Sequence, residues 1–295
     1  MYAIETQGLT KDYGKGKGIF DVTLQVPQGE AFGFLGPNGA GKTTTIRHLL
    51  GFIRPQKGWC GILGKNCFDE AAEIQRHLGY LPGELAFLDG MTGKALLDFL
   101  AQMKNLKDKR HMTELIDRFE LDPSGPIKKM SKGMKQKLGL VAALMARPSV
   151  LILDEPTSGF DPLMQNRFVE LILEEKKRGT TVFMSSHMFE EVARTCDRTA
   201  ILRDGKIAAI EDMASLKNKR SRHYVVTLDT PQRAAALRLE NFEIASREGA
   251  RVVIPVQNDV QNLLRQLSAL PVQDLDIRTP TLEEIFLCYY GGDRT

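Results

Sequence analysis

Residues 36–43 form a glycine-rich stretch. It reads Gly36-Pro37-Asn38-Gly39-Ala40-Gly41-Lys42-Thr43 and matches the pattern G-x-x-x-x-G-K-[ST] at each fixed position. The apolar run 31–35 precedes it, and 43–50 has the pattern of a helix. This pattern binds phosphate when it lies between a strand and a helix. The chain is therefore predicted to contain an α/β unit built around a phosphate-binding loop.

The residue types of this loop suit the chemistry of a nucleotide polyphosphate. Glycines allow consecutive backbone N–H groups to turn inward around phosphate oxygens, and the helix that follows adds the positive end of its dipole. We expect Lys42 to reach the β- and γ-phosphates and the Thr43 hydroxyl to bind Mg²⁺. The residues predicted to bind the nucleotide here are Gly36, Pro37, Asn38, Gly39, Ala40, Gly41, Lys42, Thr43 and Thr44.

Two later apolar runs end in polar residues. The run 150–153 leads into Asp154 and Glu155, and the run 181–184 leads into Ser185, Ser186 and His187. Such runs are typical of buried parallel strands that carry functional groups at their carboxyl ends. Asp154 is the expected Mg²⁺ carboxylate, and Glu155 is the residue expected to orient and polarise an attacking water. An isolated Asp-Glu pair is usually a loop cap, so this interpretation depends on the loop upstream.

Composition excludes several classes of protein. The chain has 295 residues, room for about two domains. Its 40 Lys and Arg against 37 Asp and Glu give no electrostatic reason to expect a nucleic-acid partner. No apolar run approaches the ~18 residues of a membrane span, and no signal peptide is recognisable, so we expect a cytoplasmic location. The cysteines are expected to be reduced packing residues: Cys60, Cys67, Cys196 and Cys288.

Three further regions are expected along the chain. Apolar residues at helical spacing within 84–147 indicate a helical subdomain. The basic stretch 213–223 is expected to be a linker, and 224–295 a small α+β domain whose βαββαβ order is typical of a ferredoxin-like fold. Its elements are predicted at 224–228, 231–239, 242–247, 251–256, 260–270 and 272–279, before a last helix with a capping box of Thr281 and Glu284.

Several motifs follow the phosphate-binding loop in a fixed order. They are Ser131-Lys132-Gly133-Met134, then Leu151-Ile152-Leu153-Asp154-Glu155-Pro156-Thr157-Ser158-Gly159-Phe160-Asp161, then Ser185-Ser186-His187. In this order and spacing they resemble the motifs of an ABC ATPase, the nucleotide-binding component of ABC transporters. The resemblance covers residues 1–212. It implies a P-loop NTPase core with a helical subdomain, ATP and Mg²⁺ as ligands, and ATP hydrolysis as the activity.

The resemblance also implies roles for individual residues. Tyr13 matches the aromatic residue that stacks on adenine, with an aromatic at the edge of the core as the alternative. Ser131 and Gly133 match the signature motif, which contacts the γ-phosphate bound by a partner subunit. Asp161 matches the loop that links the two active sites, and His187 matches the switch histidine near the γ-phosphate. The implied catalytic residues are Glu155, His187 and Lys42, and the implied metal ligands are Thr43 and Asp154.

Two departures from the family pattern stand out. After Gly79-Tyr80-Leu81-Pro82 the family usually has Gln, whereas this chain has Gly83 followed by Glu84, so the role of that side chain is either lost or taken by Glu84. The signature reads Met130-Ser131-Lys132-Gly133-Met134 in place of Leu-Ser-Gly-Gly-Gln. Lysines surround this motif. They are expected either to form a solvated face of the helix or to assist phosphate binding.

The C-terminal region indicates which group of ABC ATPases the chain resembles. The stretch 281–286, followed by Tyr289 and Tyr290, looks like the tail of ATPases that serve ABC-2-type exporters of drugs and antibiotics. The expected partners are a separate transmembrane permease, which would hold the chain at the inner face of the membrane, and a second ATPase subunit arranged head to tail. The alternatives are a soluble ABC-type ATPase of translation or DNA maintenance and a non-hydrolysing regulatory subunit.

Overall fold

The computed structural model describes residues 1–87, 90–218, 222–256 and 259–278. Contacts within the chain divide it into two units, Met1–Met213 and Ala214–Thr295. The stretch 213–223, expected to be a linker, instead contains helix α8 (Met213–Asn218) and the start of strand β11 at Arg222. Met213 and Leu216, three residues apart on α8, are both buried. These two apolar side chains explain why the start of this stretch folds as a helix, since most of its basic residues follow α8.

The first unit contains two β-sheets. The four-stranded antiparallel sheet has the order β2-β1-β4-β5, and the six-stranded sheet has the order β10-β9-β3-β8-β7-β6. In the larger sheet all neighbouring strands are parallel except β10, which pairs antiparallel with β9. The strands are β1 Tyr2–Asp12, β2 Gly18–Pro27, β3 Ala31–Leu35, β4 Lys57–Ile62, β5 Lys65–Asn66, β6 Leu78–Leu81, β7 Val150–Asp154, β8 Thr181–Ser186, β9 Arg198–Arg203 and β10 Lys206–Asp212.

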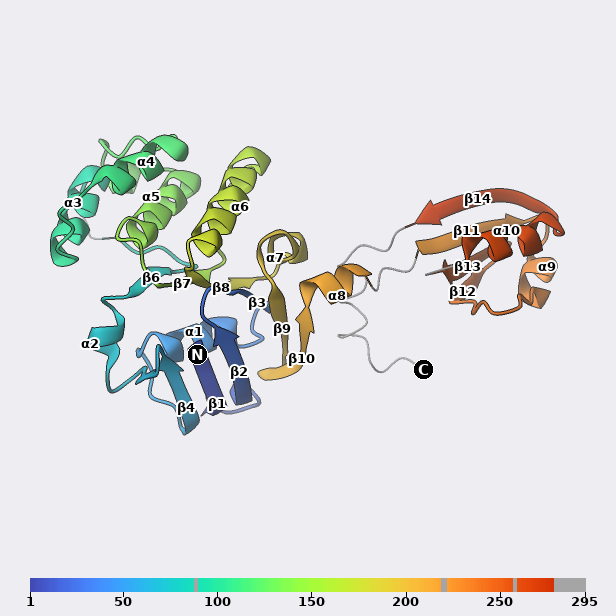
Figure 1. Ribbon diagram of the computed structural model, residues 1–295, viewed down its shortest axis with the longest axis horizontal. Helices are drawn as coiled ribbons and strands as arrows, with labels where there is room; N and C mark the ends of the chain where they lie inside the picture. The colour runs from blue at the N-terminus through green and yellow to red at the C-terminus, as the bar shows by residue number, and fades with distance from the viewer. Residues whose placement is uncertain (88–89, 219–221, 257–258, 279–295) are drawn as a thin grey trace. The chain divides into compact units, whose positions relative to one another are not determined.

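Every residue of β3, β7 and β8 is buried, as the continuous apolar runs predict for central parallel strands. Helix α1 (Lys42–Leu49) follows β3 and shares one hydrophobic core with both sheets. Its Ile46 and Leu49 belong to the same buried cluster as Ile4 of the small sheet and Phe183 of the large one. This packing holds the N-terminus of α1 at the carboxyl edge of the large sheet (Figure 1).

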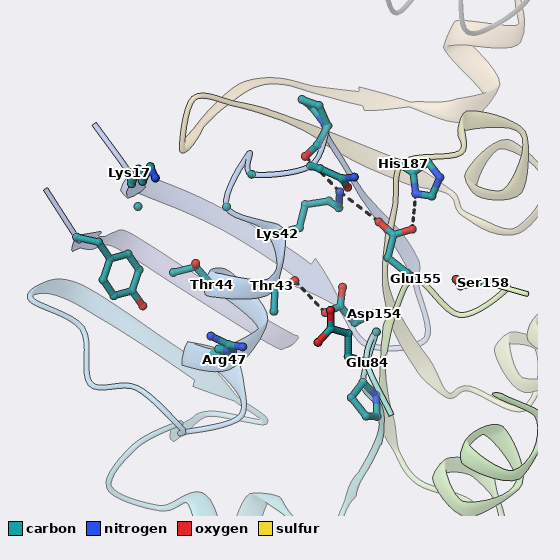
Figure 2. A pocket seen from close by; sticks show the side chains of 18 of the residues that line it. Lys17, Lys42, Thr43, Thr44, Arg47, Glu84, Asp154, Glu155, Ser158 and His187 are labelled. Atoms are coloured by element: carbon teal, nitrogen blue, oxygen red, sulfur yellow. Dashed lines mark hydrogen bonds and ion pairs between the residues drawn. The ribbon is translucent and has the colours of Figure 1, made fainter. Parts of the chain in front are cut away.

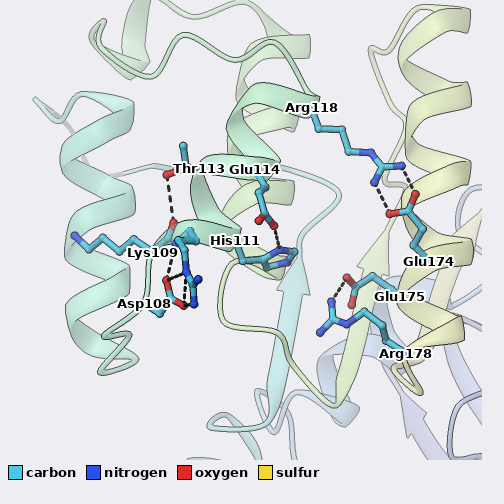
Figure 3. A network of polar contacts seen from close by, with 10 residues as sticks. Asp108, Lys109, His111, Thr113, Glu114, Arg118, Glu174, Glu175 and Arg178 are labelled. Atoms are coloured by element: carbon cyan, nitrogen blue, oxygen red, sulfur yellow. Dashed lines mark hydrogen bonds and ion pairs between the residues drawn. The ribbon is translucent and has the colours of Figure 1, made fainter.

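The helices of the first unit follow the expected order. Residues 84–147 contain α3 (Gly93–Met103), α4 (Arg110–Arg118), the 3-10 turn η1 (Ile127–Lys129) and α5 (Lys132–Leu144), while α2 (Ala71–Ile74), α6 (Pro162–Lys177) and α7 (Phe189–Thr195) lie outside this stretch. Arg118 of α4 reaches across to Glu174 of α6 (Figure 3). The pair is bidentate, with N–O distances of 2.5 and 2.9 Å, and joins the helical subdomain to the core.

The second unit has the expected ferredoxin-like topology. Its sheet has the order β12-β13-β11-β14, all pairs are antiparallel, and a separate apolar core includes Tyr224, Val226 and Leu263. Its elements are β11 Arg222–Leu228, α9 Pro231–Ala236, β12 Ser246–Glu248, β13 Arg251–Val256, α10 Val260–Ser268 and β14 Val272–Arg278. The strand predicted at 242–247 is shorter, because Phe242 and Ile244 pack on the core without strand pairing. The last predicted helix, with Thr281 and Glu284, lies outside the described residues.

The α/β fold class with its helical subdomain is confirmed by this architecture. Cys60, Cys67 and Cys196 are free and buried, in agreement with their predicted packing role; Cys288 lies outside the described residues. Among the described residues, no helix is both long and apolar enough to cross a bilayer.

Candidate active site

The glycine-rich loop joins the end of β3 to the start of α1. Gly39 and Gly41 have backbone φ angles of 83° and 109°, a region that residues with a Cβ atom rarely adopt. Lys42 is the first residue of α1, and its ammonium donates to the carbonyl oxygens of Gly36 at 2.6 Å and Pro37 at 3.4 Å. The lysine side chain is thus folded back over the loop, with its charge at the place where the backbone N–H groups of the helix start converge.

A cavity of about 800 Å³ opens beside this loop. Figure 2 shows charged side chains entering it from α1, from the loop after β6 and from the ends of β7 and β8. Its described lining consists of Tyr13, Lys17, Gly18, Pro37, Asn38, Gly39, Gly41, Lys42, Thr43, Thr44, Arg47, Tyr80, Pro82, Gly83, Glu84, Lys132, Asp154, Glu155, Ser158 and His187. The predicted adenine-stacking residue Tyr13 lines this cavity and is 53% exposed, with the Lys11 ammonium 5.6 Å from the centroid of its ring.

Asp154 ends β7 and is fixed by two hydroxyl groups. The Thr43 hydroxyl donates to Asp154 Oδ2 at 3.0 Å, and the Ser185 hydroxyl at the end of β8 donates to Oδ1. Adjacent parallel strands bring these residues together, since β7 pairs Asp154 directly with Ser185. An alcohol and a carboxylate oxygen beside the phosphate loop are the ligand types that Mg²⁺ takes when phosphates supply the rest of its shell.

Glu155 lies between two basic groups. Its Oε1 is 3.2 Å from the Lys42 ammonium, and its Oε2 is 2.5 Å from His187 Nδ1. Figure 2 shows the carboxylate between these two side chains, one from α1 and one from the turn after β8. All three residues predicted to be catalytic therefore meet in one cavity.

Five of the predicted binding residues lie outside the cavity lining in the described chain. Gly36 presents its carbonyl to Lys42, and Ala40 is buried. Ser131 and Asp161 cap α5 and α6, accepting hydrogen bonds from the N–H groups of Met134 and Met164. Gly133 packs against the turn after β7, where a Cβ atom would come within 3.0 Å of the Gly159 carbonyl oxygen.

Comparison with known proteins identifies the family. A family model for ABC transporters matches residues 19–158. The bacitracin transport ATP-binding protein BcrA of Bacillus licheniformis is 34% identical over 298 residues, covering 98% of this chain and 97% of that protein. The chain belongs to the ATP-binding proteins of ABC transporters. The daunorubicin/doxorubicin resistance ATP-binding protein DrrA of Streptomyces peucetius is 31% identical over 307 residues, covering 98% of this chain and 92% of that protein.

Solved structures agree with this assignment. The ATP-binding subunit of an ABC transporter has a TM-score of 0.69 and 31% identity, covering 74% of this chain and 92% of that chain. A dimeric cassette, MJ0796 bound to ADP and Pi, shares the fold with a TM-score of 0.65 at 20% identity, covering 71% and 98%. The chain is an ABC ATPase, as predicted, and the alternatives outside transport are not favoured. ABC ATPases as a family form dimeric cassettes and act with membrane permeases.

Sequence reasoning missed several residues that line the cavity beside the phosphate-binding loop. Lys17, Arg47, Tyr80 and Ser158 all contribute to its wall. Arg47 carried a usable signal, because it follows Thr43 by four residues and so shares a helix face with it. Tyr80 and Ser158 carried one as well, because both lie within family motifs. Lys17 carried none, since only the packing of the small sheet brings it to the cavity.

The departure at Gly83 lies beside Asp154 in the cavity wall. A Cβ atom at Gly83 would stand 3.4 Å from the Asp154 carboxyl carbon, so the side chain that the family has here would enter the site. Glu84 is exposed and lines the same cavity (Figure 2). Next to Asp154 this chain therefore has no side chain at position 83 and a carboxylate one residue later.

A buried acid, Glu191 of α7, supports the turn that carries His187. The Ser186 hydroxyl donates to Glu191 Oε2 at 2.7 Å, and only 6% of Glu191 is exposed. Burial raises the pKa of Glu191 to about 7, against the opposing effect of the Ser186 hydrogen bond. This carboxyl group is close to its midpoint of ionisation near neutral pH.

Proposed function

We propose that this ABC ATPase powers a separate membrane permease that exports antibiotic-like compounds. The observation that carries this proposal is the similarity to BcrA and DrrA over both units, since each alignment covers 98% of the chain. The names of those relatives specify bacitracin transport and daunorubicin/doxorubicin resistance. The ATPase would lie at the inner face of the membrane through its permease, with no nucleic acid involved.

ATP and Mg²⁺ are the proposed ligands of the cavity. Mg²⁺, when bound, neutralises charge on the β- and γ-phosphates. Thr43 and Asp154 would hold it, and their 3.0 Å oxygen–oxygen contact already brings both ligands to one point. Lys42 and the backbone N–H groups of residues 38–44 would bind the phosphates, and Tyr13 would stack on the adenine, which is worth ~1–3 kcal/mol for an aromatic–base contact.

The chain's own groups fit a hydrolytic reaction. Glu155 is the proposed general base, which accepts a proton from the attacking water, and His187 holds the carboxylate from the opposite side at 2.5 Å. In phosphoryl transfer most of the catalysis is positioning and charge neutralisation. Lys42 contacts Glu155 at 3.2 Å, and we propose that the γ-phosphate of bound ATP takes over this lysine contact and frees the carboxylate to receive the proton.

The remaining predicted residues are proposed to act in a head-to-tail dimer of this chain. Ser131 lies at the start of α5 and Asp161 at the start of α6, and neither lines the cavity of its own chain among the described residues. Helix N-termini favour anions, so Ser131 and Gly133 would meet the partner's γ-phosphate. Asp161 would then lie where the two sites approach each other. The second unit, with its independent core, is proposed to be a packing or dimerising module.

The experiment is drug-stimulated ATP turnover in a reconstituted complex. The chain is purified with the permease that co-purifies in detergent, and phosphate release is measured in liposomes with and without bacitracin or daunorubicin. We expect turnover that a drug stimulates and that Glu155→Gln abolishes. ATP turnover with neither a permease partner nor any drug response would contradict the exporter role while leaving the ATPase assignment intact.

A further inference from the structure

The turn that carries Glu155 is held in an uncommon backbone conformation. Glu155 has a φ of 49°, in the left-handed region that costs an ordinary residue roughly 1–2 kcal/mol. Such a conformation persists only where the surrounding structure holds it. One contact that holds this conformation comes from the sheet: the Glu155 N–H donates to the Ser185 carbonyl of β8 at 3.1 Å.

The second set of contacts that holds the Glu155 turn comes from helix α5. The side-chain amide of Gln136 donates to the Pro156 carbonyl at 2.9 Å and to the Glu155 carbonyl at 3.3 Å. Gln136 is 2% exposed, so water does not compete for these contacts. The start of the same helix packs on the same turn through Gly133, whose missing Cβ atom lets it approach the Gly159 carbonyl.

We propose that Gln136 is a positioning residue for Glu155, and that it ties the general base mechanically to the helix whose N-terminus carries Ser131. The Gln136 amide donates hydrogen bonds to two consecutive carbonyls of the turn, so the helix and the turn move together. A displacement of α5 therefore carries the Glu155 backbone with it. The inference rests on the proposed function for the role of Glu155 as general base and for assigning the Ser131 end of α5 to the partner's nucleotide; the link from Gln136 to Glu155 lies within one chain.

This link gives the two sites of a dimer a physical connection. When the start of α5 engages a phosphate of the partner site, the helix shifts by the small amount that packed elements allow. Gln136 passes that shift to the Glu155 carboxylate of its own site. Occupation of one site would thereby position the base in the other.

The test is a double-mutant cycle on the full-length chain. Gln136→Met removes the amide but preserves the length of the side chain, and we expect kcat for ATP hydrolysis to fall about 10- to 100-fold, the effect of a misplacement of roughly 1 Å. The KM for ATP should stay within about twofold, because Lys42 and the phosphate loop are untouched. In a Glu155→Gln background, Gln136→Met should cause no further loss, because Gln136 acts only through Glu155.

A matched control and a second variant complete the experiment. Gln165→Met alters a glutamine that donates to the Phe160 carbonyl at 3.4 Å, four residues beyond Pro156, and should retain wild-type kcat. If Gln136→Met does not fold, Gln136→Asn keeps an amide that is too short to reach the turn and should show the same loss. Wild-type kcat in either folded variant, or a loss that multiplies with Glu155→Gln, would overturn the proposal. Absence of turnover in the wild-type chain would instead contradict the proposed function.

Discussion

At the scale of single residues, the site is organised around one carboxylate with two basic neighbours from distant parts of the chain. Lys42 and His187 approach opposite oxygens of Glu155, at 3.2 and 2.5 Å. The carboxylate is 22% exposed, so it is accessible to water while its position is fixed. In the proposed function these two parts of the site have separate roles: the loop around Lys42 binds phosphate, and Glu155 acts on the water.

Glu155→Gln should therefore affect chemistry and not binding. The amide keeps the shape of the side chain but cannot accept the proton, and a general base commonly contributes ~10²–10⁴-fold to rate. We expect kcat to fall by about that factor with ATP affinity retained, measured by phosphate release and by equilibrium binding of ATP. Glu190→Gln, an exposed acid on α7, is the matched control. Hydrolysis at the wild-type rate by Glu155→Gln would show that another group is the base.

Glu191 should make stability depend on pH. Its pKa is about 7 in the folded chain, above the usual 4.5, so the fold favours the protonated acid. The free energy of unfolding should fall as pH rises from about 4.5 to 7, by up to roughly 3 kcal/mol. Glu191→Gln carries no charge, so its stability relative to wild type should increase across this window.

Urea unfolding of both proteins at about pH 5 and about pH 8 checks this prediction. The groups coupled electrostatically to Glu191 are Glu155 and His187, and Glu190→Gln on the same helix serves as the control for a general charge effect. If the free energy of unfolding changed by the same amount between the two pH values in wild type and in Glu191→Gln, the raised pKa of Glu191 would be contradicted.

At the scale of elements, side-chain caps and close backbone approaches set where the functional turns lie. Ser131 and Asp161 cap α5 and α6, and Pro162 occupies the first turn of α6, where a missing N–H costs nothing. In the large sheet, β3 approaches α7 closely at Gly33. Because α7 follows directly on His187, the packing of β3 on α7 also positions that histidine.

Gly33→Ala should destabilise the first unit. A Cβ atom at this position would lie 2.3 Å from Val192 Cγ1 of α7 and 3.0 Å from the Thr199 hydroxyl, and Val192 is fully buried. Overpacking of this kind costs about 1–3 kcal/mol in a denaturant unfolding experiment. Gly125→Ala has no atom within 4 Å of the new Cβ and should be nearly neutral. If Gly33→Ala and Gly125→Ala had equal free energies of unfolding, α7 would shift to make room for the new Cβ atom without loss of stability.

At the scale of the whole molecule, two hydrophobic clusters, one in each unit, share no residue among those described. One lies between the two sheets of the first unit, and the other lies between the antiparallel sheet and helices α9 and α10. The described residues that line the cavity beside the phosphate-binding loop all belong to the first unit. The stability of the second unit should therefore be separable from catalysis.

Leu263→Ala tests this separation. Leu263 is fully buried in the second core, and such truncations cost about 2–5 kcal/mol. We expect calorimetry to show one transition lowered and a second unchanged, with ATP turnover retained. Leu264→Ala, on the same helix but 44% exposed, should shift neither transition appreciably. A single transition that shifts as a whole would contradict independent cores.

The dimer proposal predicts complementation between two inactive chains. Ser131→Arg blocks the start of α5, and Lys42→Ala removes the phosphate-binding lysine. In a mixed head-to-tail dimer one site carries both lesions and the other carries neither, so phosphate release should recover to a fraction of the wild-type rate. The mixture is compared with each variant alone. No recovery would favour sites contained within one chain or strict coupling of both sites.

Local sequence was sufficient for much of this protein. The phosphate loop, the polar ends of β7 and β8, and the βαββαβ order of the second unit could all be predicted, because each depends on residues that are adjacent or periodic along the chain. The motif order also determined the family and hence the expected roles of Lys42, Asp154 and Glu155.

Only the tertiary structure decided which distant residues surround those motifs. Gln136 holds the turn of Glu155 across 19 and 20 residues of sequence, Glu191 supports the His187 turn from inside the protein, and Lys17 reaches the cavity from the edge of the small sheet. Helix α8 likewise forms where two apolar side chains, Met213 and Leu216, are buried. Contacts of this kind depend on how sheets and helices pack, and the free energy of that packing is shared among residues that no local pattern connects.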